Sequence, residues 1–218
     1  MAIVNYAPPT RPYLQIVFKD EYVLVLNKPS GLLTVPGKAL EHKDSLELRV
    51  QRVYPTARIV HRLDMATSGL LVMALDKDTH RQLSKQFELR QTRKTYIARV
   101  FGQVNGERGS VDLPLMCDWP NRPKQMVCQQ RGKPSLTHWR ILERNDHTTR
   151  MELTPVTGRS HQLRVHMLSL GHPILGDRLY AHFDALAMAN RLQLHAQTLG
   201  FTHPATNASV DFHAPVPF

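Results

Sequence analysis

The chain has 218 residues, 42% of them hydrophobic, which is enough for one large α/β core or a core divided between two lobes. Lys and Arg number 28 against 18 Asp and Glu, so the formal net charge is +10, which suits a polyanionic partner; a merely solvated basic surface is the alternative that charge alone leaves open. There is no signal-peptide hydrophobic core at the start and no apolar run near the roughly 20 residues of a membrane span, so we expect a cytoplasmic protein.

The first elements are two short strands, over residues 15–18 and 22–26, followed by a Pro- and Gly-rich loop that runs to Gly37. Asp44 and Ser45 then provide a helix start, and the spacing of Leu46, Val50 and Val53 predicts a surface helix.

Residues 70–75 form an almost wholly apolar run between Gly69 and Asp76, which predicts a buried strand entered through the Thr67-Ser68-Gly69 turn. Asp64 then lies in a loop at the strand edge. Arg62 and His61 could keep its carboxylate ionised, as a catalytic carboxylate requires. The alternative is that Asp64 is an ordinary turn or capping residue.

A helix over residues 78–89 is indicated by Leu83 and Phe87 on a polar segment, and a strand over 93–104 follows. Strand alternation places Lys94, Tyr96 and Ala98 on one face, with Tyr96 turned inward, where it either serves the site or simply packs in the core. Residues 105–135 are rich in Gly and Pro, so we expect loops and short hairpins there that can touch substrate.

Antiparallel strands over residues 137–142 and 149–156 are predicted around the turn Asn145-Asp146. A helix over 160–170 should pack Leu163, Met167 and Leu170 inward, and two closing strands should span 192–201 and 208–213. The whole pattern predicts an α+β fold, a largely antiparallel mixed sheet with flanking helices and loops.

The sequence gives no sign of a metal or cofactor. Cys117 and Cys128 are too far apart for a zinc knuckle and should be reduced thiols, and no two of the 12 histidines have His-x-x-x-His spacing. Neither a Gly-x-x-x-x-Gly-Lys-Ser/Thr loop nor a Gly-x-Gly-x-x-Gly motif is found, so we expect neither a nucleotide cofactor nor a metal.

Several separated motifs resemble those of the RluA-type pseudouridine synthases. The catalytic segment of that family, His-Arg-Leu-Asp followed by Thr-Ser-Gly, stands here at residues 61–64 and 67–69. A Lys-x-Tyr-x-Ala strand follows at 94–98, and Thr-Gly-Arg-x-His-Gln-x-Arg-x-His occupies 157–166. Weaker matches are residues 27–33 and 171–177, so the resemblance covers most of the chain.

The resemblance implies a pseudouridine synthase catalytic domain over residues 1–218 without a separate N-terminal RNA-binding module. It implies a cofactor-free isomerisation in which Asp64 attacks the anomeric carbon or the uracil ring, or acts as a base toward the sugar. Tyr96 and Arg164 complete the expected catalytic set: Tyr96 would stack on the uracil and reach its C5 proton, and Arg164 would pair with Asp64. Phosphate binding is the alternative role for Arg164.

The substrate uridine must be extruded from the RNA before it can react. Arg62 is expected to fill the vacated stack, with an ion pair to Asp64 as the alternative. His61, Lys94, Arg159 and His161 are further expected to contact RNA or to assist flipping, although a structural role is the alternative for His61.

The likeness is greatest to short dual-specificity members of the family, which implies stem-loops of large-subunit rRNA and of tRNA, including an anticodon stem-loop, as substrates. We expect no DNA partner and a monomer. Two other classes remain. A non-catalytic RNA-binding or chaperone protein would keep only the basic surface, and a base-excising glycosidase would need a second carboxylate, whereas Asp76 and Asp78 lie at the far end of the strand from Asp64.

Overall fold

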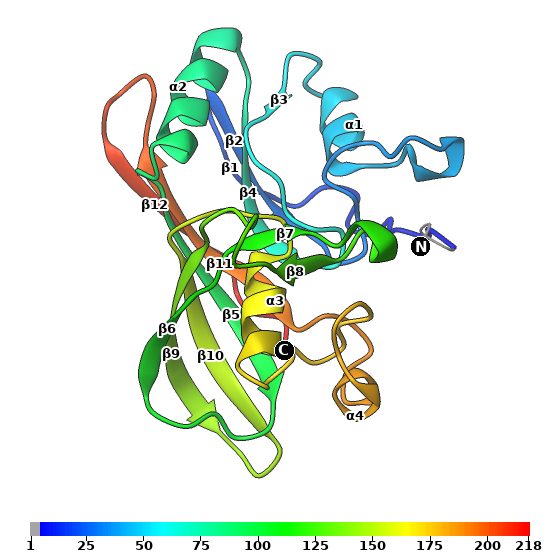
Figure 1. The fold of residues 1–218 in the computed structure, drawn as a ribbon. Helices are drawn as coiled ribbons and strands as arrows, with labels where there is room; N and C mark the ends of the chain where they lie inside the picture. The colour runs from blue at the N-terminus through cyan, green and yellow to red at the C-terminus, as the bar shows by residue number, and fades with distance from the viewer. Residues whose placement is uncertain (1–4) are drawn as a thin grey trace. The chain divides into compact units, whose positions relative to one another are not determined.

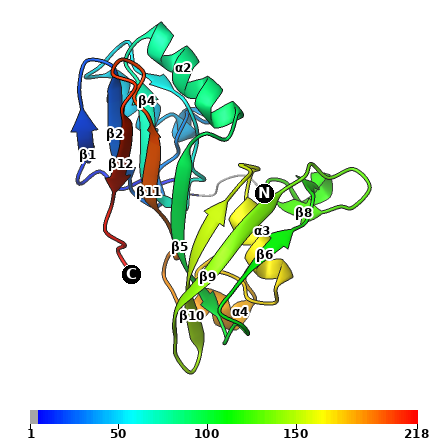
Figure 2. The ribbon, with the colours of Figure 1, turned by 90° about the vertical axis from the view of Figure 1, so that its left-hand side faces the viewer.

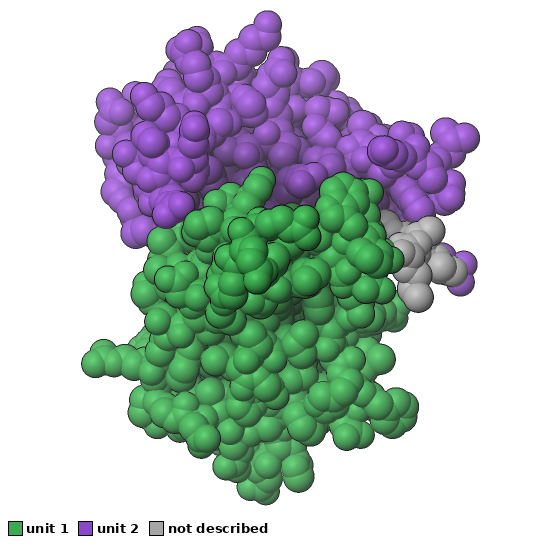
Figure 3. Space-filling view, in the orientation of Figure 1, with its two compact units in different colours: residues 1–2, 95–195, 218 green, residues 3–94, 196–217 purple. Residues whose placement is uncertain are grey.

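The computed structural model describes residues 5–218, which fold as an α+β protein built from antiparallel strands with a few short helices (Figures 1 and 2). The described residues divide into two compact units (Figure 3). One unit holds residues 95–195 together with 218, and the other holds residues up to 94 together with 196–217. We call them the central unit and the terminal unit.

The terminal unit is built on the apolar runs of the first third of the chain. Its strands follow the order β1 (Ile16–Lys19), β2 (Val23–Lys28), β4 (Ser68–Ala74) and β11 (Leu194–Thr202), with β3 (Arg58–Ile59) beside β4 and β12 (Ser209–His213) beside β11. All seven residues of β4 are buried, as the apolar run predicts.

Two helices and a short 3-10 turn complete this unit. The turn spans η1 (Leu40–His42), and α1 (Leu46–Gln51) begins at its cap Ser45, whose side chain accepts from the N–H of Leu48. Asp76 caps α2 (Lys77–Glu88) in the same way, and Leu83 anchors that helix in the core cluster of Val23, Val25, Leu70, Val72 and Phe201.

The central unit contains the strands β5 (Arg93–Phe101), β10 (Thr148–Pro155), β9 (Leu136–Arg144) and β6 (Arg108–Asp112), in this order. Between β6 and β9 lie the hairpin β7 (Leu115–Cys117) and β8 (Gln125–Val127) and the turn η2 (Trp119–Asn121). Helices α3 (Gln162–Ser169) and α4 (Phe183–Ala187) follow β10.

The predicted fold class and most predicted elements are confirmed, with four differences. Val53 lies beyond the end of α1 and is 58% exposed, and β5 ends at Phe101 because Gly102 takes a φ of +78°. β6 joins the main sheet beside β9 instead of remaining in a loop region. Helix α3 buries Leu163 and Met167 as predicted, but it also buries polar residues that the prediction did not include: Gln162, Arg164 and His166.

Two general features follow from the same description. Both cysteines, Cys117 and Cys128, are free thiols. Within residues 5–218, the helices are too short or too polar for any of them to cross a membrane.

Candidate active site

Asp64 lies in a tight turn that leads into β4. Its main-chain carbonyl accepts from the N–H of Thr67 at 3.1 Å, and Thr67 and Ser68 are buried behind it. Gly69 has a φ of +116°, and a Cβ there would collide with the main chain of Ala196 on β11. The Thr-Ser-Gly motif therefore lets the backbone of the Asp64 turn approach the neighbouring strand closely.

The turn is held from the other side by the segment that follows β2. Lys28 is fully buried, and its ammonium donates to the carbonyls of Leu32 at 2.7 Å and Met65 at 3.1 Å. Three more bonds reach the same turn, from Ser30 Oγ to Ala66 O, from Gly31 N to Met65 O and from Thr34 Oγ1 to Leu63 O. Residues 27–34 thus form a cradle that fixes the main chain around Asp64.

His61 is a neutral structural residue. Its Nε2 accepts the N–H of Val72 at 3.2 Å, and its ring stacks on Phe87 of α2 with centroids 4.3 Å apart. Burial, and secondarily the positive charge of Lys94, lowers the pKa of His61 to about 3. An imidazole that is neutral at pH 7 supplies no charge to Asp64.

Arg62 behaves differently from its neighbour. Its side chain is exposed, and within residues 5–218 it makes no hydrogen bond or ion pair. Neither residue therefore supplies the paired positive charge that was expected beside Asp64, because Arg62 forms no ion pair and His61 is uncharged. The alternative of an ion pair between Arg62 and Asp64 is excluded by the same observation.

Lys94, at the start of β5, lies beside His61. Its ammonium is 5.7 Å from the centroid of the Phe87 ring, and burial lowers its pKa. Both His61 and Lys94 therefore gather around Phe87. The RNA-binding role expected of Lys94 stays a prediction.

Tyr96 lies further along β5, where strand alternation places it on the same face as Ala98 and Val100, both fully buried. Tyr96 itself is only half-buried, opposite Leu153 of β10. Because Ile97 on the opposite face of β5 is buried as well, burial does not decide which way the ring of Tyr96 points, and its inward orientation stays a prediction.

Arg164 on α3 is held by a partner that sequence reasoning did not name. Its Nε and Nη2 donate to the two carboxylate oxygens of Asp177, both at 2.7 Å, and the two side chains are 5% and 1% exposed. The ring of Tyr180 lies 5.0 Å from the guanidinium carbon, and the Tyr180 hydroxyl is 2.7 Å from Nδ1 of His161. His161 and Arg164 are therefore brought together by Tyr180.

Other residues of the motif at 157–166 support the local structure. Gln162 donates to Leu136 O and accepts from Thr157 Oγ1, and buried His166 lies 2.9 Å from Thr137 Oγ1. Arg159 is exposed, and its Nε donates to Pro134 O at 3.3 Å. Arg159 is the member of this group that remains accessible to a ligand.

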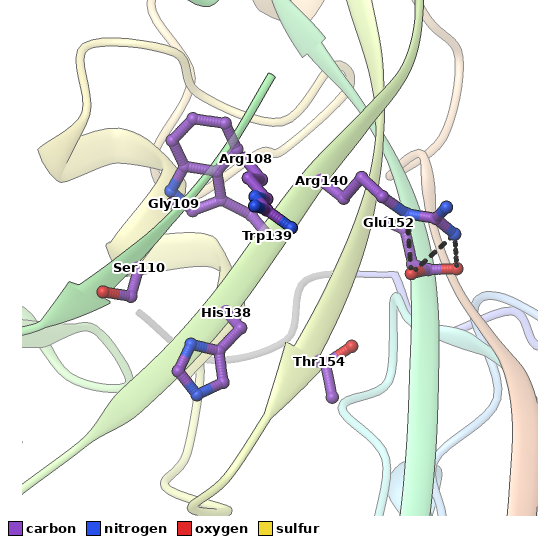
Figure 4. A pocket seen from close by; sticks show the side chains of 8 residues that line it. All are labelled: Arg108, Gly109, Ser110, His138, Trp139, Arg140, Glu152 and Thr154. Carbon is purple, nitrogen blue, oxygen red and sulfur yellow. Dashed lines mark hydrogen bonds and ion pairs between the residues drawn. The ribbon is translucent and has the colours of Figure 1, made fainter. Parts of the chain in front are cut away.

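A separate open cavity of about 460 Å³ is lined by residues of β6, β9 and β10 (Figure 4). Arg108, His138 and Arg140 line it, but Figure 4 shows Arg140 paired with Glu152, which offsets its charge. None of the predicted site residues contributes to this cavity. Among residues 5–218 no group of three His, Cys, Asp or Glu side chains is placed to hold a metal.

The structure thus brings the predicted residues together in two groups. His61, Arg62, Asp64 and Lys94 belong to the terminal unit, and Tyr96, Arg159, His161 and Arg164 to the central unit. The expected pairing of Asp64 with Arg164 stays a prediction. The residues that sequence reasoning missed are Lys28, Asp177 and Tyr180. The first two lie within the weaker motif matches at 27–33 and 171–177, which were a signal for them.

These features define an enzyme of one family. The family model described as RNA pseudouridylate synthase matches residues 22–169, which is more than half of the chain. The chain belongs to this family and is an isomerase that converts uridine in RNA to pseudouridine.

Individual relatives match over the whole chain. It is 57% identical over 219 residues, and over 100% of both chains, to the Dual-specificity RNA pseudouridine synthase RluA of Salmonella typhimurium and to that of Escherichia coli strain K12. Among solved structures, Human RNA Pseudouridylate Synthase Domain Containing 1 matches with a TM-score of 0.80 and 30% identity, covering 97% of this chain and 87% of that one.

Proposed function

We propose that this enzyme isomerises specific uridines in stem-loops of both large-subunit rRNA and tRNA, including an anticodon stem-loop. The observation that carries the proposal is the full-length 57% identity to enzymes named dual-specificity synthases, together with an unaltered catalytic segment on a rigidly held turn. We further propose that the two units act as one catalytic domain, in the cytoplasm and as a monomer bound to RNA.

Asp64 is the proposed catalytic residue. The reaction breaks the C1′–N1 bond of uridine, turns the uracil, and joins C1′ to C5, whose proton is then lost. Attack by Asp64 on C1′, attack on the uracil ring, and removal of a sugar proton all require a carboxylate that is held in place, and the cradle of residues 27–34 fixes the main chain that carries it. Arg164 would supply the charge that Arg62 and His61 do not.

Tyr96 is the proposed partner of the base. Its half-buried ring offers a face for stacking on uracil, and its hydroxyl could accept or relay the C5 proton.

Arg62 is the proposed residue for base flipping. Its side chain is exposed, within residues 5–218 has no ion-pair partner, and is two positions from Asp64, so it can move into the space left by an extruded uridine at little cost to the fold. Lys94, Arg159 and His161 are proposed to contact RNA, as is usual for recognition of a loop by shape and charge.

Tritium release from RNA labelled at uridine C5 tests the proposal. Wild type should release tritium from an rRNA stem-loop and from a tRNA anticodon stem-loop, Asp64→Asn should release none, and Asp146→Asn, at an exposed turn, should match wild type. Release from only one RNA would refute dual specificity. Binding without release by wild type would instead support the RNA-binding alternative, and free uracil as product would support a glycosidase.

A further inference from the structure

The two motif segments 157–166 and 171–177 are in contact through Arg164 and Asp177. Their contact suggests a role for the second segment. The Asp177 carboxylate accepts two charge-assisted hydrogen bonds of 2.7 Å from one edge of the guanidinium, from Nε and Nη2. Such a fork leaves little freedom for the guanidinium to rotate in its own plane.

Asp177 is itself firmly held. Its Oδ1 also accepts the N–H groups of Leu179 at 2.9 Å and Tyr180 at 3.3 Å, and these two bonds close the turn over residues 177–180. Gly176 precedes it with a φ of +68°, and a side chain there would collide with the main chain of Arg191. The Asp177 carboxylate is therefore held by main-chain N–H groups as well as by Arg164.

Tyr180 restricts the remaining motion. Its ring covers one face of the Arg164 guanidinium at 5.0 Å. Its hydroxyl accepts the N–H of Gln125, in the β7–β8 hairpin, at 2.8 Å and contacts His161. In-plane rotation of Arg164 is thus limited by Asp177, and tilting by Tyr180.

We propose that Asp177 is a positioning residue for the isomerisation: it fixes the orientation of the Arg164 guanidinium, the group proposed to assist Asp64 in catalysis. This inference rests on the proposed catalytic pair of Asp64 and Arg164. It assigns a function to the motif at residues 171–177, for which the proposed reaction itself requires no role.

The terminal unit contains a matched control. Arg49 is held by Asp44 through the same two nitrogens, at 2.8 and 2.6 Å, and its guanidinium carbon is 4.7 Å from the ring centroid of Tyr13. Nη1 of Arg49 donates to the carbonyls of Pro9 and Tyr13, so the whole guanidinium is used to hold main chain far from the proposed catalytic residues in sequence. Asp44 therefore supports structure only.

The first test compares Asp177→Asn with Asp44→Asn in steady-state kinetics on one stem-loop RNA. Asp177→Asn should lower kcat by about 100-fold with KM within about twofold of wild type, since a misplacement near 1 Å can cost that much. Asp44→Asn should lower the urea midpoint but leave kcat within about twofold. A kcat for Asp177→Asn equal to that of wild type would overturn the proposal.

The second test asks whether Asp177 acts through Arg164. The double variant Arg164→Gln/Asp177→Asn replaces the ion pair by two neutral amides, so it avoids the lone buried charge that could unfold Asp177→Asn. It should have the same kcat as Arg164→Gln, whereas a further fall would show an independent effect and overturn the proposal. Inactivity of wild type itself would refute the proposed function instead.

Discussion

His61 gives a quantitative test of how the site is built. Its Nε2 accepts the N–H of Val72 inside the terminal unit, so protonation would turn an acceptor into a donor facing another donor. The pKa falls from 6.5 to about 3 on folding. Because the folded pKa is the lower one, the associated stability is complete above pH 6.5 and is lost as the pH falls from 6.5 toward 3.

The magnitude at pH 5 follows from the unfolded pKa alone, since the folded group is still neutral there. At pH 5, which is 1.5 pH units below the unfolded pKa of 6.5, protonation of the His61 imidazole in the unfolded state lowers the free energy of unfolding by about 2 kcal/mol. His61→Gln keeps an acceptor but cannot titrate. The stability of wild type relative to this variant should therefore fall by about 2 kcal/mol between pH 7.5 and pH 5.

Urea unfolding of both proteins at the two pH values measures this difference, and groups that titrate equally in both cancel. His138→Gln is the control, because His138 is exposed on the outer face of β9. An equal pH dependence of wild type and His61→Gln would refute the reasoning, because His61 would then not be buried as a neutral acceptor.

Three further predictions concern the Asp64 turn and its neighbours. Gly69→Ala should destabilise the protein by about 3 kcal/mol or more and lower the melting temperature by at least about 6 °C, because the new methyl group meets the main chain of Ala196. Lys28→Met should cost about 3 kcal/mol in urea unfolding and also lower kcat, because the carbonyls of Leu32 and Met65 lose the buried ammonium that joins them and the turn loosens. Arg62→Ala should leave stability within about 0.5 kcal/mol but lower kcat/KM on a stem-loop by about 10- to 100-fold, with a smaller loss on unstructured RNA. Equal losses on both RNAs would argue against a flipping role.

The elements that sequence reasoning predicted well are those specified by local chemistry. The buried strand β4 follows from its apolar run, and α2 begins where Asp76 provides a cap. Helix α3 was predicted to pack Leu163, Met167 and Leu170 inward, and nothing was predicted of its polar residues. Those residues are in fact buried: Arg164 is paired with Asp177, and His166 with Thr137, 29 positions earlier. Partners that lie this far apart in the sequence leave no periodic pattern within the helix from which the burial of its polar residues could be predicted.

The site shows the same division. Asp64 and Arg62 could be recognised from a contiguous motif, but the charge balance around them could not. A sequence places His61 next to Arg62 without revealing that one ring is turned onto Phe87 and the other side chain toward solvent. The supports, Lys28 and Asp177, lay in matches too short to suggest a role.

Two clusters in this chain show why an ion pair alone does not identify a functional residue. Arg49 and Arg164 are each gripped by an aspartate and covered by a tyrosine ring, with nearly equal distances. At Arg49, main-chain carbonyls also bind Nη1, so removal of Asp44 can only loosen the fold. Arg164 instead belongs to a motif shared with a catalytic family, so the same change at Asp177 should appear in kcat. The same Asp→Asn replacement should therefore lower the urea midpoint at Asp44 and kcat at Asp177. The affected quantity separates structural support from positioning.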